Sequence, residues 1–201
     1  MIYCILGKSG SGKTTILNKL MEKKLGIRKV IQYTTRPQRV EEINDIDYHF
    51  IDNDFFDWML KNNILASSES YKVVGGEVWR YGSALCDFTD LWDKVIITNP
   101  EEYQQLISNA KLKDKIRSIY IHCDLLERIN RCYSRQIHDD FDNEKIIGTS
   151  KEITRRLIHE ENSFYVLGDK ENYDLILNNN NESDLSDAID KLVDFIEVNN
   201  E

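Results

Sequence analysis

Short apolar runs along the chain alternate with longer segments in which apolar residues recur every three or four positions. The runs predict strands, at Met1–Leu6, Val30–Thr34, Tyr48–Ile51, Val95–Thr98, Ile116–His122 and Tyr173–Leu177. The periodic segments predict helices, at Lys13–Leu25, Phe55–Asn62, Glu101–Lys111, Leu125–Gln136 and Leu185–Val198. Strands that alternate with helices indicate an α/β fold, with a mostly parallel sheet flanked by helices.

Polar residues and one proline mark where several of these helices begin. Asn53 or Asp54 is a candidate N-cap of the second helix, and Ser183 or Asp184 of the last. Pro100 suits the first turn of the third helix, where its missing N–H costs nothing.

Two segments interrupt the alternation. Residues 32–83 are rich in strand-forming residues and contain Gly75-Gly76, which predicts a small β-rich insertion. Residues 137–150 are polar and acidic with little periodicity, which predicts a mobile loop between two helices that carry arginines.

Composition limits the class of partner. The 201 residues suffice for one core domain with insertions. With 35 acidic and 26 basic residues the net charge is −9, which argues against nucleic acid as a partner. It does not argue against a nucleotide, because a local group of arginines can bind phosphate within an acidic protein.

The cysteines and the lengths of the apolar runs indicate the cellular compartment in which we expect the protein. Cys4, Cys86, Cys123 and Cys132 form no C-x-x-C pair and lie at no metal-ligand spacing from histidine, which favours a reducing cytoplasm. We expect no signal peptide, and no apolar run approaches the roughly 18 residues of a membrane span. The oligomeric state is left open.

The segment "GKSGSGKTT" follows the first predicted strand and opens the first predicted helix. Gly7, Gly12, Lys13 and Thr14 fit the phosphate-loop pattern G-x-x-x-x-G-K-[ST]. Glycines let phosphate oxygens approach the backbone N–H groups, Lys13 reaches the β- and γ-phosphates, and the Thr14 hydroxyl is a ligand for Mg²⁺. The predicted nucleotide-binding set is Gly7, Ser9, Gly10, Ser11, Gly12, Lys13, Thr14 and Thr15.

Arginines form two further groups. Arg36 and Arg39 lie three residues apart in the insertion, and their planar forks suit phosphate oxygens. Arg131 and Arg135 share one helix face, and Arg156 follows the predicted loop. Such arginines could equally be ordinary surface charges, paired for example with Glu127 or Glu152. A phosphate loop with two separate arginine groups is nevertheless what transfer between two phosphates requires.

With these motifs the chain resembles the guanylate kinases and related nucleoside monophosphate kinases over nearly its whole length. The resemblance rests on "GKSGSGKTT", "TTRPQR…DYHF", "RYGS", "RCYSR", "ITRRL" and "YDLILNN". It implies a P-loop NTPase fold whose core comprises residues 1–31, 84–130 and 158–201. It also implies an acceptor-binding insertion at 32–83 and a lid at 131–157.

The resemblance also implies roles. Arg36, Arg39 and Tyr48 would hold the acceptor phosphate, helped by Tyr81 and Ser83. The implied catalytic residues are Lys13, Arg131, Arg135 and Arg156. The implied activity is ATP-dependent phosphorylation of GMP or dGMP with Mg²⁺, and the implied partners are small nucleotides.

The positions that read guanine in the family depart from its pattern here. The family's glutamate, aspartate and serine fall respectively near Ala66 or Glu69, near Thr98 or Asn99, and at Gln32 or Tyr33. We take Glu69 as the candidate base-binding residue. The departures leave two alternatives open: a kinase of another monophosphate or of ribose 1,5-bisphosphate, and a guanylate kinase-like binding module without activity.

Overall fold

A parallel five-stranded sheet forms the centre of the protein. The computed structural model describes residues 1–73, 75–136, 143–166 and 172–199. Every strand pair in this sheet is parallel. The strand order is β2 (Arg28–Lys29), β7 (Lys94–Ile97), β1 (Ile2–Leu6), β8 (Ile116–His122) and β9 (Leu175–Asn178). The predicted α/β class with a mostly parallel sheet is confirmed.

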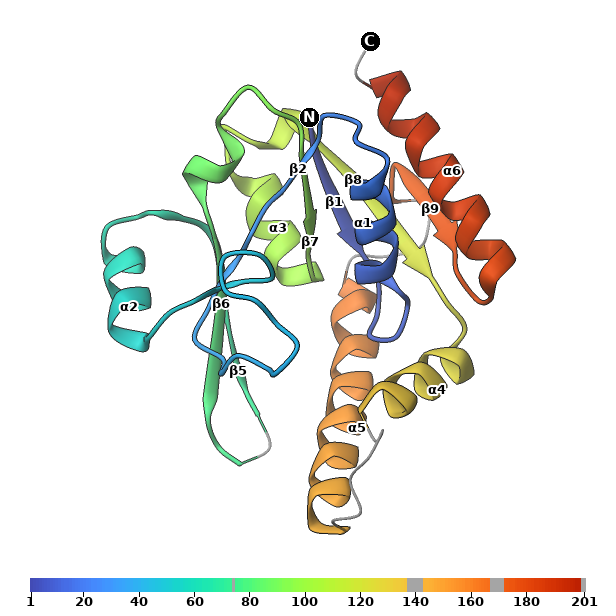
Figure 1. Ribbon diagram of the computed structural model, residues 1–201. Coiled ribbons are helices and arrows are strands. Elements are labelled where there is room, and N and C mark those ends of the chain that lie inside the picture. Colours follow the sequence, from blue (N-terminus) through green and yellow to red (C-terminus); the bar gives the residue numbers. More distant parts are fainter. Residues whose placement is uncertain (74, 137–142, 167–171, 200–201) are drawn as a thin grey trace.

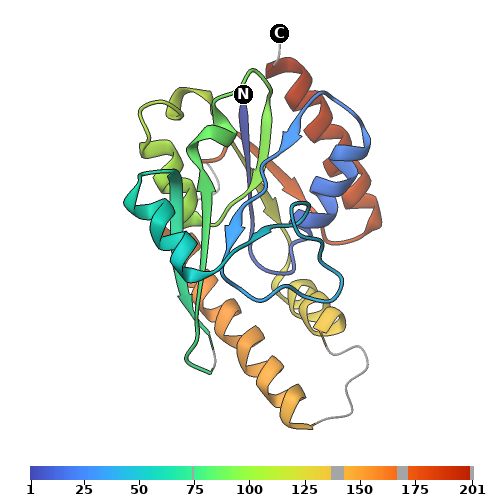
Figure 2. The ribbon, with the colours of Figure 1, turned by 60° about the vertical axis from the view of Figure 1, so that its left-hand side comes forward.

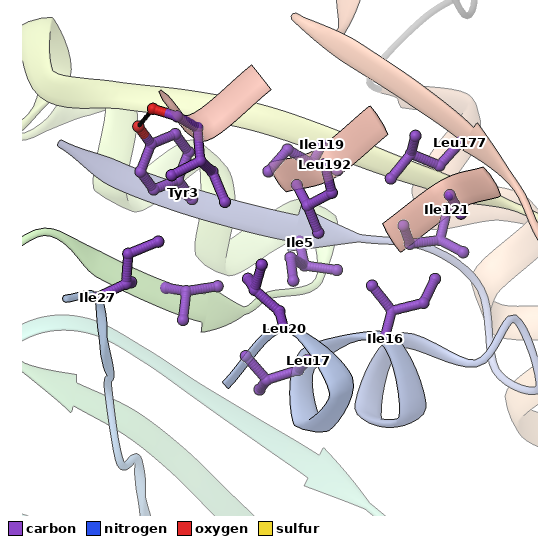
Figure 3. Packing of buried hydrophobic residues seen from close by; sticks show 13 residues of the cluster. Tyr3, Ile5, Ile16, Leu17, Leu20, Ile27, Ile119, Ile121, Leu177 and Leu192 are labelled. Atoms are coloured by element: carbon purple, nitrogen blue, oxygen red, sulfur yellow. Dashed lines mark hydrogen bonds between the residues drawn. The ribbon is translucent and has the colours of Figure 1, made fainter. Parts of the chain in front are cut away.

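Helices cover both faces of the sheet (Figure 1). On one face, α1 (Lys13–Glu22) and α6 (Glu182–Asn199) pack on β1 and β8, with Leu20 and Leu192 almost fully buried (Figure 3). On the other face lie α3 (Pro100–Ser108) and the final turns of α5 (Asn143–Val166). Because β1 is buried on both faces, all five of its residues are apolar.

A second, four-stranded sheet lies beside the first (Figure 2). Its order is β4 (His49–Phe50), β3 (Tyr33–Thr34), β6 (Val78–Ala84) and β5 (Leu65–Lys72), and helix α2 (Asn53–Lys61) connects β4 to β5. The strands β5 and β6 form a long antiparallel hairpin. Short 3₁₀ helices occupy Leu85–Phe88 and Lys113–Lys115.

The predicted strand Val30–Thr34 is wrong as a single element, because the chain changes sheets within it. The Val30 N–H still donates to Val95 of the core sheet, whereas the Gln32 carbonyl already accepts from His49 of the second sheet. Both halves are apolar and extended, so the sequence pattern carried no sign of the change.

The predicted loop at 137–150 is also partly wrong. Helix α4 spans Leu125–Gln136 as expected, but α5 begins at Asn143. Ile146, Ile153 and Phe164 recur along α5 at helical spacing, and Ile153 and Phe164 are buried. Most of this helical periodicity lies after residue 150, so residues 137–150 taken alone did not reveal it. Residues 137–142 lie outside the described residues.

Helices α1 and α4 start at the predicted residues, whereas α2, α3 and α6 start one to three residues earlier than predicted. The cap of α2 is Asp52, whose carboxylate accepts the Phe55 N–H, rather than Asn53 or Asp54. Helix α6 begins at Glu182, and Asn181 accepts the Asp184 N–H, so the predicted cap lies within the helix. Pro100 occupies the first turn of α3, as predicted.

The cysteines are all free, with Cys4, Cys123 and Cys132 buried and Cys86 exposed. In the part of the chain that the structure describes, no helix is both long and apolar enough to cross a bilayer.

A buried carboxylate joins the second sheet to the core. Glu102, on the first turn of α3, accepts hydrogen bonds from Ser83 at 2.7 Å, Ser67 at 2.8 Å and the Gln32 amide at 2.7 Å. Ser67 and Ser83 belong to strands β5 and β6 of the second sheet, and Gln32 directly precedes its strand β3. Burial raises the pKa of Glu102 to about 7, against the opposing effect of these donors.

Glu102 should make the stability of the protein depend on pH. The pKa is about 4.5 in an ordinary environment and about 7 in the folded protein, so folding favours the protonated form. This contribution is complete below pH 4.5 and is lost as the pH rises to 7. Over that range the free energy of unfolding of wild type should fall by up to about 3 kcal/mol relative to Glu102→Gln. Urea denaturation at several pH values tests this, and a difference that does not vary with pH would contradict it.

Candidate active site

The loop from Gly7 to Gly12 connects the end of β1 to the start of α1. Gly10 and Gly12 have φ values of +80° and +87°, which side chains disfavour. A Cβ on Gly10 would lie 2.4 Å from the Arg128 carbonyl oxygen, and one on Gly12 would lie 2.2 Å from the Asn179 amide nitrogen. These glycines are therefore required by tight packing behind the loop, in addition to any ligand in front of it.

Asn179 is a residue of this site that the sequence motif alone did not single out. It follows β9, is buried, and donates from its amide to the Ser11 carbonyl at 2.8 Å. Its own carbonyl accepts from Arg131 at 2.9 Å. Asn179 thus fixes the phosphate loop and one of the predicted catalytic arginines from a single position.

Lys13 folds back over the loop. Its amine donates to the Gly7 carbonyl at 2.6 Å. Burial lowers its pKa, Glu160 opposes that change, and Arg135 adds to it. Thr14 and Thr15 are exposed on the first turn of α1, where helical N–H groups lack intrahelical acceptors. The Ser11 hydroxyl is buried and has no hydrogen-bond partner among the described residues.

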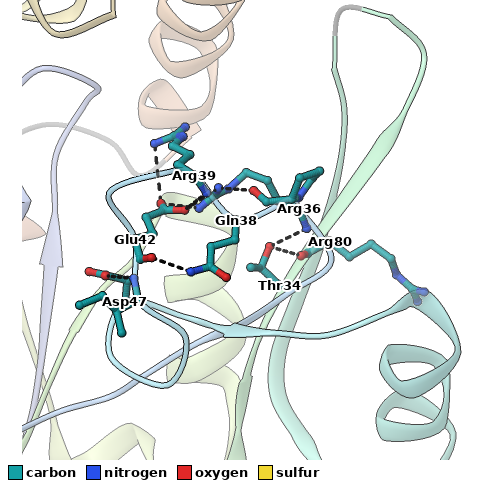
Figure 4. A network of polar contacts seen from close by, with 9 residues as sticks. Thr34, Arg36, Gln38, Arg39, Glu42, Asp47 and Arg80 are labelled. Atoms are coloured by element: carbon teal, nitrogen blue, oxygen red, sulfur yellow. Dashed lines mark hydrogen bonds and ion pairs between the residues drawn. The ribbon is translucent and has the colours of Figure 1, made fainter.

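In the second sheet, Arg36 is buried and paired with a carboxylate (Figure 4). Its guanidinium donates to both oxygens of Glu42, at 2.7 and 2.9 Å, and Glu42 also accepts the Arg39 N–H. Burial would raise the pKa of Glu42, but these bonds lower it below its ordinary value. Arg36 is thus held in place, while the Arg39 side chain is 43% exposed.

Aromatic rings surround the Arg36 guanidinium. It lies 5.3 Å from the centre of the Tyr48 ring, and Tyr48 meets Tyr81 edge-on at 6.0 Å. Burial is the main cause that raises the pKa of Tyr48 to about 12, so its hydroxyl keeps its proton and can donate. Of the predicted acceptor residues, Arg36, Tyr48 and Tyr81 lie together, whereas Ser83 is fully buried against Glu102.

The three predicted lid arginines lie on α4 and α5. Arg131 donates to Glu127 at 2.8 Å and Arg156 to Glu152 at 3.0 Å, so the pairing anticipated as the alternative interpretation is present. Hydrogen bonds from Arg155 and Arg156 outweigh burial and lower the pKa of Glu152 to about 2. These ion pairs do not exclude phosphate binding by the same arginines, because a phosphate group can take the place of the glutamate carboxylate.

These cations lie close enough to influence one another. The pKa of Arg39 is lowered, first by burial and then by the positive charges of Arg36, Arg156 and Arg135. Arg135 also acts on Lys13. Positive side chains from the phosphate loop, from the residues 32–83 that contain the second sheet, and from helices α4 and α5 therefore lie near one another.

Beside these cations, Glu69 belongs to a hollow lined by Ser68, Glu69, Tyr81, Asn99 and Glu102. Tyr71 and Asn99 both donate to Glu69, and burial raises the pKa of Glu69. Sequence reasoning assigned Glu69 and Asn99 to this region but missed Glu102 and Ser68. The sequence did contain a signal for Glu102, since it lies in the first turn of the helix that follows β7.

Comparisons with known proteins agree with this geometry. The guanylate kinase family model matches residues 1–77. The guanylate kinase of Neisseria gonorrhoeae (strain ATCC 700825 / FA 1090) is 37% identical over 59 residues, 29% of each chain. That of Syntrophotalea carbinolica (strain DSM 2380 / NBRC 103641 / GraBd1) is 34% identical over 85 residues, 42% of this chain and 38% of the relative. The aligned segments thus span well under half of these relatives.

The fold comparison extends along the chain. The crystal structure of guanylate kinase from Anaplasma phagocytophilum superposes with a TM-score of 0.63 at 19% identity, covering 99% of this chain and 85% of that one. This likeness concerns the fold, which is that of a P-loop NTPase. Residues 1–77 thus match the guanylate kinase family in sequence, and nearly the whole chain is similar in fold to a guanylate kinase.

Proposed function

We propose that this protein is an ATP-dependent guanylate kinase that transfers the γ-phosphoryl group of ATP to GMP or dGMP. The main support is the shared electrostatic field of Lys13, Arg39, Arg135 and Arg156, which come from three separate parts of the fold. Two polyphosphates that must approach each other need such a concentration of cations, because their own charges repel.

The phosphate loop suits the donor. The loop has glycine at positions 7, 10 and 12, the Ser11 hydroxyl is buried without a described partner, and Thr14 is exposed. These features fit a magnesium–triphosphate group, with Thr14 as the protein ligand of the ion. When bound, Mg²⁺ would draw negative charge from the phosphate oxygens. Among the described residues, no group of three or more His, Cys, Asp or Glu side chains could hold a metal ion.

The side chains that line the hollow at Glu69 and Glu102 offer hydrogen-bond acceptors of the kind that guanine requires. The two glutamates line it together with Asn99 and Tyr81. A charged carboxylate only accepts hydrogen bonds, and guanine presents two adjacent donor groups, N1–H and the 2-amino group. Adenine presents an unprotonated N1 at the same edge, which a carboxylate would repel. Leaving a buried partner unpaired costs about 1–3 kcal/mol, enough to discriminate between bases.

In this proposal the residues act by position and charge. Arg36, Arg39 and Tyr48 hold the acceptor phosphate, with Arg36 fixed by Glu42. Lys13, Arg131, Arg135 and Arg156 offset the charge that develops during transfer. The attacking oxygen belongs to a phosphate that is already an anion, so the reaction needs no general base from the protein.

A coupled assay across acceptors tests the proposal. GMP and dGMP should be phosphorylated at least about tenfold more efficiently than AMP, CMP, UMP or ribose 1,5-bisphosphate, in line with one unpaired buried group. Preference for another acceptor would reassign the substrate. Turnover with none of them would favour a binding module.

Replacing the phosphate-loop lysine should abolish activity. Lys13→Ala removes a cation from the site of charge transfer and should lower kcat/KM by at least about 10²-fold while the fold persists. Circular dichroism and thermal denaturation check the fold. Lys19→Ala, on the exposed side of the same helix, is the matched control and should be near wild type. Near-wild-type turnover by Lys13→Ala would refute the phosphate-loop assignment.

Changes in the insertion should act on the acceptor alone. Arg39→Ala removes a charge-assisted contact worth about 1.5–3 kcal/mol and should raise the acceptor KM by about one to two decades, with little change in the KM for ATP. Tyr48→Phe should have a smaller effect because it loses a neutral donor.

Arg28→Ala provides a control for the loss of a positive charge. Arg28 lies over the ring of Trp92, outside the group of arginines that act on Arg39. Its replacement should leave both KM values unchanged. An equal rise in the ATP and acceptor KM values in Arg39→Ala would contradict separate donor and acceptor sites.

A further inference from the structure

A carboxylate of the protein is bound to the phosphate loop. Glu160, on α5, accepts the Ser9 backbone N–H through one oxygen at 2.7 Å and the Ser9 hydroxyl through the other at 2.5 Å. Its charge also acts on Lys13, opposing the effect of burial on that amine. A backbone N–H, a hydroxyl and a nearby ammonium are the groups that a phosphate loop offers to an anion.

The neighbouring residue holds Glu160 in this position. Glu161 pairs with Lys8 at 2.5 Å and with Arg128 at 2.9 Å. Lys8 belongs to the phosphate loop, and Arg128 is a buried residue of α4 that lies directly behind Gly10. These two ion pairs fasten α5 beside the loop, so the contact of Glu160 with Ser9 follows from the packing of α5 as well as from its own attraction.

The position of Glu160 on α5 links the loop to the lid arginines. Glu152, Arg156 and Glu160 are spaced four residues apart and therefore share one helix face. On this face of α5, Arg156 can bind a phosphate group, whereas Glu160, one turn later, would repel it. A carboxylate near bound triphosphate would repel the phosphate oxygens and would no longer have the Ser9 N–H as a donor.

We propose that Glu160 is an internal ligand of the phosphate loop that competes with the triphosphate of the nucleotide and must leave before the nucleotide can bind. The inference rests on the proposed function, because it takes the loop to be the triphosphate site. The apparent affinity of the loop for ATP is then the intrinsic affinity reduced by the fraction of molecules in which Glu160 has left. It follows that α5 tunes nucleotide affinity through a residue that the transfer itself does not use.

Direct binding of ATP without acceptor tests the proposal. The dissociation constant of Mg–ATP is measured by calorimetry for wild type, Glu160→Gln and Glu22→Gln. Glu22 lies exposed at the far end of α1, so its replacement makes the same change in charge without touching the loop. Glu160→Gln should bind ATP about tenfold more tightly than wild type, and Glu22→Gln should equal wild type.

Two further measurements separate competition from a general change in charge. Adenosine carries no phosphate, so its affinity should be the same in all three proteins. The Ser9 amide should exchange with solvent faster in Glu160→Gln than in wild type without nucleotide, because its charged acceptor is gone. Thermal denaturation establishes that the variants are folded, and Glu160→Ala serves as a second variant in which no amide can replace the carboxylate.

The outcomes are distinct. Equal or weaker ATP binding by both Glu160 variants, with wild type binding ATP, would overturn the inference alone and would make Glu160 neutral or supportive toward the nucleotide. Failure of every variant and of wild type to bind ATP would overturn the inference together with the proposed function.

Discussion

The region between the phosphate loop, the second sheet and helices α4 and α5 brings together like charges that repel one another. Arg36, Arg135 and Arg156 act on the ionisation of Arg39 there, and Arg135 acts on that of Lys13. A folded chain can tolerate such crowding only if anions lie close by. The structure supplies them as glutamates: Glu42 binds Arg36, Glu127 binds Arg131, Glu152 binds Arg156, and Glu160 binds the loop itself. Each glutamate makes a contact of the kind that a phosphate oxygen could make.

This arrangement separates two kinds of pair. The Arg36–Glu42 pair is buried and bidentate, so Glu42 fixes the orientation of an arginine that can still present its face to Tyr48 and to a ligand. The pairs on α4 and α5 are more exposed and hold their arginines less firmly, since exposed ion pairs contribute about 0–1 kcal/mol. The first kind suits a permanent part of a binding site. The second kind suits pairs whose arginines can exchange one anionic partner for another.

The same region contains two carboxyl groups, the buried Glu102 and the partly buried Glu69, that form no ion pair with a cation among the described residues. Glu102 is held by two hydroxyls and an amide, and Glu69 by an amide and a phenol. The neutral donors lower the pKa of each group, but burial outweighs them and the pKa of each remains raised. A ligand with N–H donors would complete their hydrogen bonding.

The amino-acid sequence by itself determined the parts of this protein that depend on local order. The phosphate loop could be predicted because its glycines, Lys13 and Thr14 are contiguous, and strand β8 and helix α4 because their periods are complete within each segment. The arginine groups were found for the same reason. Tertiary structure alone decided where the chain leaves one sheet for the other near Val30, because both halves of that run are equally extended and apolar. It also decided that Glu102, Asn179 and Glu160 meet residues as many as 168 positions away, since a single glutamate or asparagine carries no local mark of the partner that packing will bring to it.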